Sequence, residues 1–130
     1  VFSNDVTWAV EMTATGEPIG CVGYLTASAS NLQIGSNDAE VGYWIARPHW
    51  GKGICTEAML MVVDFCFNKK GFDTLWGCYF PSNPASGRVM EKCGFSDTGQ
   101  TTLCPNLLVG SNLPVKVMKL NNTFRHKTTT

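Results

Sequence analysis

The turn at residues 51–53, Gly-Lys-Gly, places two glycines and a cation at the start of a segment with helical periodicity. A short apolar run, 41–45, precedes the turn, and the periodic segment begins at Ile54. Glycines let the backbone approach a ligand closely, and the unpaired N–H groups and positive dipole end of a helix attract an anion. The spacing therefore predicts a phosphate cradle in a turn between a strand and a helix.

This turn matches neither of the two best-known phosphate-binding motifs. A Walker loop requires G-x-x-x-x-G-K-[ST], and a dinucleotide-binding fold requires G-x-G-x-x-G after its first strand. The run from Gly51 to Thr56 has the first two glycines of the second pattern and lacks the third. On this segment alone, a glycine-rich turn without a ligand is an equally good interpretation, and a nucleotide-binding domain stays open.

A second segment, Asn83–Phe95, lies one predicted strand later. Asn83 is placed to cap a helix, Pro84 suits the first helical position, and Gly94 suits the end. Taken in order, the two segments resemble those of the GCN5-related N-acetyltransferases (GNAT), in the branch of RimJ/RimL-type ribosomal-protein N-terminal acetyltransferases. The resemblance covers about Ala9 to Leu120.

The resemblance implies that the first segment binds acetyl-CoA as a cosubstrate. The family's Q/R-x-x-G-x-G/A core falls on residues 50–55, where Trp50 replaces Gln or Arg and Cys55 replaces the last small residue. Backbone groups of the preceding strand are expected to bind the pantetheine arm, the cradle amides the pyrophosphate, and Asn83 and Ser86 to face the thioester. The expected cofactor-binding residues are Ile45, Arg47, Gly51, Lys52, Gly53, Ile54, Cys55, Thr56, Asn83, Ser86 and Arg88. Lys52 and Arg88 are included because their charges suit phosphate.

The implied reaction is attack of a primary amine on the thioester carbonyl. An amine with a pKa of about 10.4 must first lose a proton, and Glu40, at the start of the strand before the cradle, is the predicted base, acting through water. A solvated glutamate at a strand end is the alternative. The amide of Ile45 is expected to stabilise charge on the carbonyl oxygen.

The departing thiolate is expected to receive its proton from Ser86. Many relatives use a tyrosine for this purpose, but Met90 stands at the matching position. A thiol pKa of about 8.5 makes such an acid helpful rather than obligatory. A hydroxyl on the helix surface is the alternative interpretation of Ser86.

Several other residues invite a functional role but have simpler interpretations. His49 could contact phosphate, although a histidine beside Pro48 in a loop is expected to be exposed. Aromatic side chains could line an acceptor cleft, but on predicted strands they are expected in the core. These aromatic residues are Trp44, Trp50, Trp76 and Phe80.

Composition excludes several classes of partner. The 130 residues, 44% of them hydrophobic, suffice for one domain with its own core. A formal net charge of zero gives no general attraction to nucleic acid or anionic lipid. The longest nearly apolar run, Ala58–Phe67, is about half the roughly 20 residues that span a bilayer. We therefore expect no nucleic-acid partner and no membrane partner.

The cysteines give no sign of a metal or redox site. Six of them, at positions 21, 55, 66, 78, 93 and 104, form no Cys-x-x-Cys pair, so no metal is expected. The even number permits disulfides, but three fall in predicted helices, where free cysteine behaves as a small buried hydrophobe. We predict free thiols and a cytoplasmic location.

Apolar periodicity and turn residues predict a mixed α/β (α+β) domain with a GNAT-like, mostly antiparallel central sheet, flanking helices and a β-α-β crossover. The expected strands are 6–12 and 19–26, forming a hairpin, then 41–45, 74–80, 95–103 and 114–120, and the expected helices are 54–70 and 84–93.

Members of the family begin with a strand and a pair of helices that form one wall of the acceptor site. Because this sequence begins at the hairpin that follows them, we expect an N-terminally shortened domain over residues 1–120 and a polar tail, 121–130. Self-association as a homodimer could cover the apolar surface left bare.

The sequence thus predicts an acetyl-CoA-dependent N-acetyltransferase whose acceptor is a primary amine, either a protein N-terminus or a small molecule. The alternative is a non-catalytic acyl-CoA-binding sensor or assembly module, suggested by the absent tyrosine and N-terminal segment. A nucleotide-binding domain would rest on the cradle alone.

Overall fold

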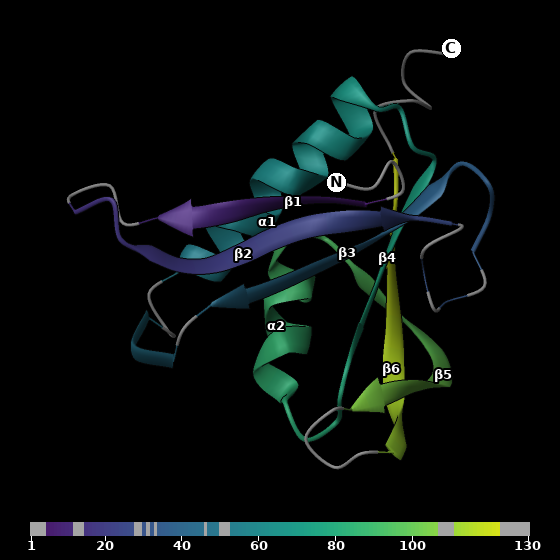
Figure 1. Cartoon of the computed structure of the whole chain (residues 1–130). Coiled ribbons are helices and arrows are strands. Elements are labelled where there is room, and N and C mark those ends of the chain that lie inside the picture. The colour runs from purple at the N-terminus through teal and green to yellow at the C-terminus, as the bar shows by residue number, and fades with distance from the viewer. Residues whose placement is uncertain are drawn as a thin grey trace.

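The computed structural model describes residues 5–11, 15–27, 30, 32, 34–45, 47–49, 53–106 and 111–122. These residues form a six-stranded sheet in the order β1-β2-β3-β4-β6-β5 (Figure 1). The strands are β1 Asp5–Glu11, β2 Pro18–Thr26, β3 Asp38–Ile45, β4 Thr74–Tyr79, β5 Ser96–Asn106 and β6 Ser111–Asn121. The helices are the short 3-10 helix η1 Arg47–His49, α1 Ile54–Asp64 with its π-helical continuation η2 Phe65–Lys69, and α2 Pro84–Lys92. The predicted mixed sheet with flanking helices is confirmed.

Helix α1 buries one stripe of its surface against the sheet. Ala58, Met59 and Val62 are buried, and Cys66 continues the stripe into η2. The predicted helix 54–70 is therefore confirmed, with the difference that its last turn is π-helical. Gly71 follows with a φ of 69°, the left-handed conformation expected at a helix C-terminus.

The sheet opens between β3 and β4, its parallel pair among the described strands. These strands pair in register at 38–40 with 74–76, although β3 continues to Ile45 and β4 to Tyr79. The other neighbouring strands are antiparallel, and α1 makes the crossover from β3 to β4. Figure 1 shows the two strands leaving in different directions beyond their paired residues. The result is a gap in the sheet at the point where α1 begins.

Helix α2 lies close against β4 on the same face of the sheet as α1. An added Cβ at Gly87 would lie 2.7 Å from the ring of Tyr79, so the helix backbone rests directly on that ring. Buried residues of α1, α2 and the sheet form one core cluster, which includes Met59, Leu75 and Met90. This packing fixes the first turn of α2 opposite the gap between β3 and β4.

The structure moves two boundaries that the sequence suggested. Strand β3 begins at Asp38, earlier than the predicted 41, because 38–40 pair with β4 and 39–40 also pair with β2. Glu40 therefore lies inside the strand and not at its start. At the other end, β6 runs through Asn121, and the buried Asn122 donates from Nδ2 to the carbonyl oxygen of Phe72 at 3.0 Å. The polar tail predicted from 121 thus begins no earlier than 123.

Five thiols lie among the described side chains, and none of these five forms a disulfide: Cys21, Cys55, Cys66, Cys78 and Cys93. In the described part of the chain, no helix is both long and apolar enough to cross a membrane. The same residues hold no cluster of three or more His, Cys, Asp or Glu side chains suited to a metal ion.

Candidate active site

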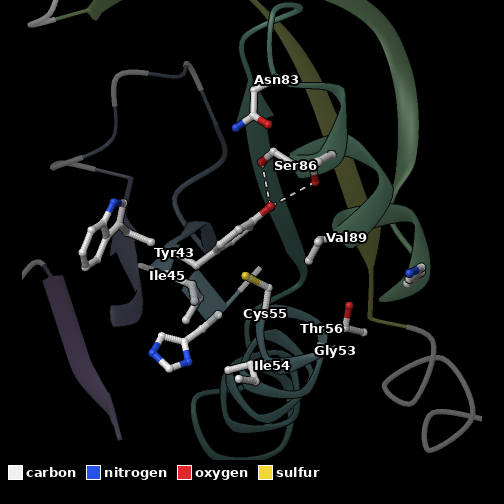
Figure 2. A pocket seen from close by; sticks show the side chains of 13 residues that line it. Tyr43, Ile45, Gly53, Ile54, Cys55, Thr56, Asn83, Ser86 and Val89 are labelled. Atoms are coloured by element: carbon white, nitrogen blue, oxygen red, sulfur yellow. Dashed lines mark hydrogen bonds between the residues drawn. The ribbon is translucent and has the colours of Figure 1, made fainter. Parts of the chain in front are cut away.

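A groove of about 240 Å³ opens on the helix side of the gap between β3 and β4. Its walls come from the end of β3, the first turn of α1 and the first turns of α2 (Figure 2). It brings together seven of the predicted cofactor-binding residues: Ile45, Gly53, Ile54, Cys55, Thr56, Asn83 and Ser86. Gly51 and Lys52 lie outside the described residues, and Arg47 falls in η1, where only its backbone is described.

The first turn of α1 borders this groove with backbone donors that have no partner within the helix. Gly53 precedes the helix with φ 77° and ψ 1°, a left-handed conformation that favours glycine, and as the N-cap residue it has no side chain with which to cap the turn. The first N–H groups of a helix have no partner within it, so the amides that begin at Ile54 are available to a ligand. With the positive end of the helix dipole, they favour an anion at this place.

His49 faces the groove, contrary to the exposed position expected for it. Its side chain is half-buried and lines the groove, and its Nδ1 atom is buried with no hydrogen-bond partner among the described residues. The 3-10 helix at 47–49 turns the imidazole inward, a local fold that the loop sequence did not indicate. An unsatisfied buried nitrogen beside an uncapped helix suits a polar or anionic ligand.

Tyr43 reaches across the groove from β3 to the first turn of α2. Its hydroxyl lies 2.6 Å from Ser86 Oγ and 3.1 Å from the Ser86 carbonyl oxygen, and it can donate its one proton to either atom (Figure 2). Burial raises the pKa of Tyr43, although the Ser86 hydrogen bond acts in the opposite direction, so the phenol stays protonated at neutral pH. The sequence analysis missed this residue; its signal was the alternation that puts 41, 43 and 45 on one face of the strand.

Helix α2 presents a different cation to the groove from the one predicted. Arg88 is exposed and is not part of the groove wall, whereas Lys92 is. Ser86, Val89 and Lys92 recur every three residues and share a face, and Arg88 lies off it. Asn83 occupies the N-cap position as predicted, but its side chain makes no capping hydrogen bond. Its amide group lines the groove instead.

Glu40 lies on the opposite face of the sheet from the groove. Its Oε1 accepts from Ser30 Oγ at 2.6 Å, and its Oε2 accepts from Cys78 Sγ at 3.6 Å. Glu40 pairs in register with Trp76, the last pair before the strands separate. Its carboxylate therefore sits at the apex of the gap, beside a second hollow of about 270 Å³ formed by β1, β2 and β3.

The aromatic residues do not all take the expected place in the core. Trp44 is 60% exposed at the second hollow, because it alternates with the buried Ile45 and so points away from the helices. Trp76 is half-buried and donates from Nε1 to Asp38 Oδ2 at 3.0 Å. The centre of its ring lies 5.8 Å from Lys119 Nζ. Phe80 is half-buried, and Trp50 lies outside the described residues.

Residues 2–96 match the protein family described as "Acetyltransferase (GNAT) domain". The chain belongs to the GNAT acetyltransferase family. It is similar to the uncharacterized N-acetyltransferase YoaA of Bacillus subtilis (strain 168), at 31% identity over 94 residues that make up 72% of this chain and 50% of the relative. This GNAT chain spans about half the length of the curated relatives it matches.

Solved structures of the same fold include two whose names state an acceptor. One is the ribosomal-protein-S5-alanine acetyltransferase from Vibrio fischeri, at 20% identity and a TM-score of 0.77, covering 92% of this chain and 62% of that one. Another is a chimera of the spermidine N-acetyltransferase SpeG from Vibrio cholerae, at 22% identity and a TM-score of 0.75, covering 96% of this chain and 70% of that one. These likenesses confirm the GNAT fold expected from the sequence.

Two residues of this GNAT domain bear on how a leaving group would be handled. Met90, at the position where the family resemblance suggested a tyrosine, is 2% exposed and belongs to the core. Cys55 lines the groove, and burial raises the pKa of its thiol, which keeps it protonated and neutral. Three residues with hydroxyl groups also line the groove: Tyr43, Ser86 and Thr56 (Figure 2).

Proposed function

We propose that the chain transfers an acetyl group from acetyl-CoA to a primary amine by direct attack on the thioester. The observation that carries this proposal is the gap between β3 and β4. On one side of the gap lies a groove bordered by the first amides of α1 and by hydroxyl groups. On the other side, at the apex of the gap, lies the Glu40 carboxylate. A donor and an acceptor could therefore approach the gap from opposite faces of the sheet.

The groove suits the anionic part of acetyl-CoA. The uncapped amides after Gly53 and the unsatisfied Nδ1 of His49 are the described groups that would hold the pyrophosphate. The two cradle residues Gly51 and Lys52 would add to them. When bound, acetyl-CoA supplies an activated acyl group, and the backbone at Ile45 would bind its arm along β3.

Glu40 would assist removal of the amine proton. An amine of pKa about 10.4 is almost fully protonated at neutral pH. Its deprotonation costs about 1.36 kcal/mol for each unit by which the pH lies below that pKa. The hydrogen bonds from Ser30 and Cys78 hold the carboxylate in place, and its position beside an open hollow admits a water molecule between it and the amine.

Ser86 would stabilise the departing sulfur from the groove side. As the new amide bond forms and the carbon–sulfur bond breaks, the electron pair of that bond goes to sulfur. A thiol of pKa about 8.5 leaves as a tolerably stable anion, so a hydrogen bond from a neutral hydroxyl is sufficient help. The amide of Ile45 is the proposed donor to the carbonyl oxygen.

The acceptor is proposed as a primary amine on the strength of the relatives. The names of the two structural neighbours specify a ribosomal-protein alanine and spermidine, and both offer an amine nucleophile. For this chain, a protein N-terminus and a small-molecule amine are the two candidate acceptors.

Acceptor-dependent release of free CoA tests the proposal. The purified chain, with acetyl-CoA, would be offered alanine- and serine-terminated peptides, spermidine and aromatic monoamines, and released thiol would be measured with a chromogenic disulfide. Mass spectrometry should show a gain of one acetyl group on the amine. Tight acetyl-CoA binding with no transfer to any of these amines would contradict catalysis and favour a non-catalytic binding module.

A further inference from the structure

The side chain of Tyr43 connects the two walls of the groove. It comes from β3, where it pairs in register with Val22 of β2, and its hydroxyl meets Ser86 on α2 at 2.6 Å from Oγ. In Figure 2 the ring crosses the groove from the Ile45 side to the Ser86 side. The contact therefore links β3, on one side of the gap, with α2, which packs on β4 on the other side.

Both ends of this contact are held firmly. Tyr43 packs against the core, and Gly87, next to Ser86, lies directly on the ring of Tyr79. Two hydroxyls that approach each other from rigid elements are already in place before a ligand arrives, so no side-chain freedom is lost at that moment.

Tyr43 has one hydroxyl proton and two possible acceptors on Ser86, the carbonyl oxygen at 3.1 Å and Oγ at 2.6 Å. A serine hydroxyl has one donor and can accept as well, and a tyrosine hydroxyl has one donor. Without a partner, a serine in a helix tends to turn its proton to a carbonyl oxygen of the preceding turn. Because Oγ is the closer acceptor and a phenol is a stronger acid than an alcohol, donation from Tyr43 to Oγ is the favoured arrangement. It leaves the proton of Ser86 available to the groove.

We propose that Tyr43 is a positioning residue that orients the hydroxyl of Ser86 into the groove, toward the sulfur of the bound thioester. The inference rests on the proposed function, because the proposed function is what places the thioester sulfur in the groove. Tyr43 acts through Ser86, so removal of either hydroxyl has the same consequence for the sulfur. A hydrogen bond to an anionic acceptor is stronger than one to a neutral acceptor, so the pair favours the thiolate over the thiol.

The test measures the thiol pKa of CoA bound to the protein, with no acceptor present. Thiolate absorbance near 235 nm would be followed between pH 6 and 9.5, with the complex of desulfo-CoA subtracted. We expect a lower pKa for the bound thiol than for free CoA. Tyr43→Phe, Ser86→Ala and the double variant should each raise that pKa by about one unit, a tenfold change in the acid dissociation constant. Tyr79→Phe, which removes a hydroxyl from a ring of β4 that packs against the same helix, is the matched control and should leave the bound-thiol pKa unchanged.

Three results would overturn the inference. The first is a bound-thiol pKa that Tyr43→Phe leaves unchanged while Ser86→Ala shifts it. The second is a double variant whose shift equals the sum of the two single shifts, because that would make the hydroxyls independent. The third is tighter binding of acetyl-CoA by Tyr43→Phe, which would mean that Tyr43 closes the groove.

The outcome separates this inference from the proposed function. If the wild-type chain binds CoA and transfers acetyl groups while Tyr43→Phe behaves as wild type, only the role assigned to Tyr43 is wrong and the proposed function stands. If the wild-type chain does not bind CoA, the proposed function fails, and the inference fails with it. Tyr43→Phe keeps the ring, and Ser86→Ala removes one half-buried hydroxyl. Thermal unfolding of each variant checks that the fold is retained.

Discussion

Replacing the carboxylate at the apex of the gap separates its chemical role from its structural one. Glu40→Gln preserves the shape of the side chain and leaves an oxygen to accept from Ser30, so the local fold should survive. It removes the base. A pH of 7.4 is three units below the pKa of an alkylamine, about 10.4. Deprotonation of that amine therefore costs about 4 kcal/mol. A positioned general base contributes about 10²–10⁴-fold, and we expect kcat/KM to fall by about 10²–10³-fold.

The assay follows CoA release against acceptor concentration from pH 6.5 to 9.5. With an alkylamine acceptor such as spermidine, the rate of Glu40→Gln should climb about tenfold per pH unit, because the fraction of free amine does so below the amine pKa. Acetyl-CoA affinity should stay at the wild-type value, since Glu40 lies outside the groove. Glu17→Gln, at an exposed turn between β1 and β2, is the matched control. A Glu40→Gln enzyme within twofold of wild type at pH 7.4 would refute the assignment.

Three further predictions concern packing, thiol chemistry and pH. Gly20→Ala should destabilise the domain by about 1–3 kcal/mol in urea unfolding, because its Cβ would meet the backbone of Trp44 and Ile45, whereas Gly42→Ala, with open space, should change stability by less than about 1 kcal/mol. The Cys66 thiol, buried in the core, should resist modification in the native state and react only after unfolding. Burial raises the pKa of Cys66 to about 12 from an unfolded value of 9.0, so its contribution to stability is full below pH 9 and is lost as the pH rises toward 12. Urea midpoints at pH 8 and pH 10.5 should therefore differ less in Cys66→Ala than in wild type, and an equal difference would contradict this.

Much of the fold could be predicted because its signals are local. The end of the first helix was marked by Gly71, which adopts the expected φ of 69°, and the start of the second by Pro84. The strand-turn-helix cradle was also readable, since Gly53 precedes a helix whose first residues line a groove. These features depend on residues near one another in the chain and on backbone preferences that few residue types satisfy.

The arrangement of side chains across the site could not be predicted in the same way. Whether Glu40 and Tyr43 share a face follows from strand alternation, but which face holds the groove depends on where α1 and α2 pack. The meeting of Tyr43 with Ser86 joins residues 43 positions apart and requires the gap between β3 and β4. His49 faces inward because of a 3-10 helix that the loop sequence does not announce.

The cradle is tested most directly by titrating acetyl-CoA into the wild-type chain, Gly53→Asp and Gly71→Asp in a calorimeter. Both glycines have a positive φ, 77° and 69°, and open space at the Cβ position, so the two variants carry similar backbone strain. Gly53→Asp also places a negative charge where the pyrophosphate is proposed to bind. We predict micromolar binding by wild type and Gly71→Asp and at least tenfold weaker binding by Gly53→Asp. Equal affinity in all three proteins, or no binding by wild type, would contradict the account.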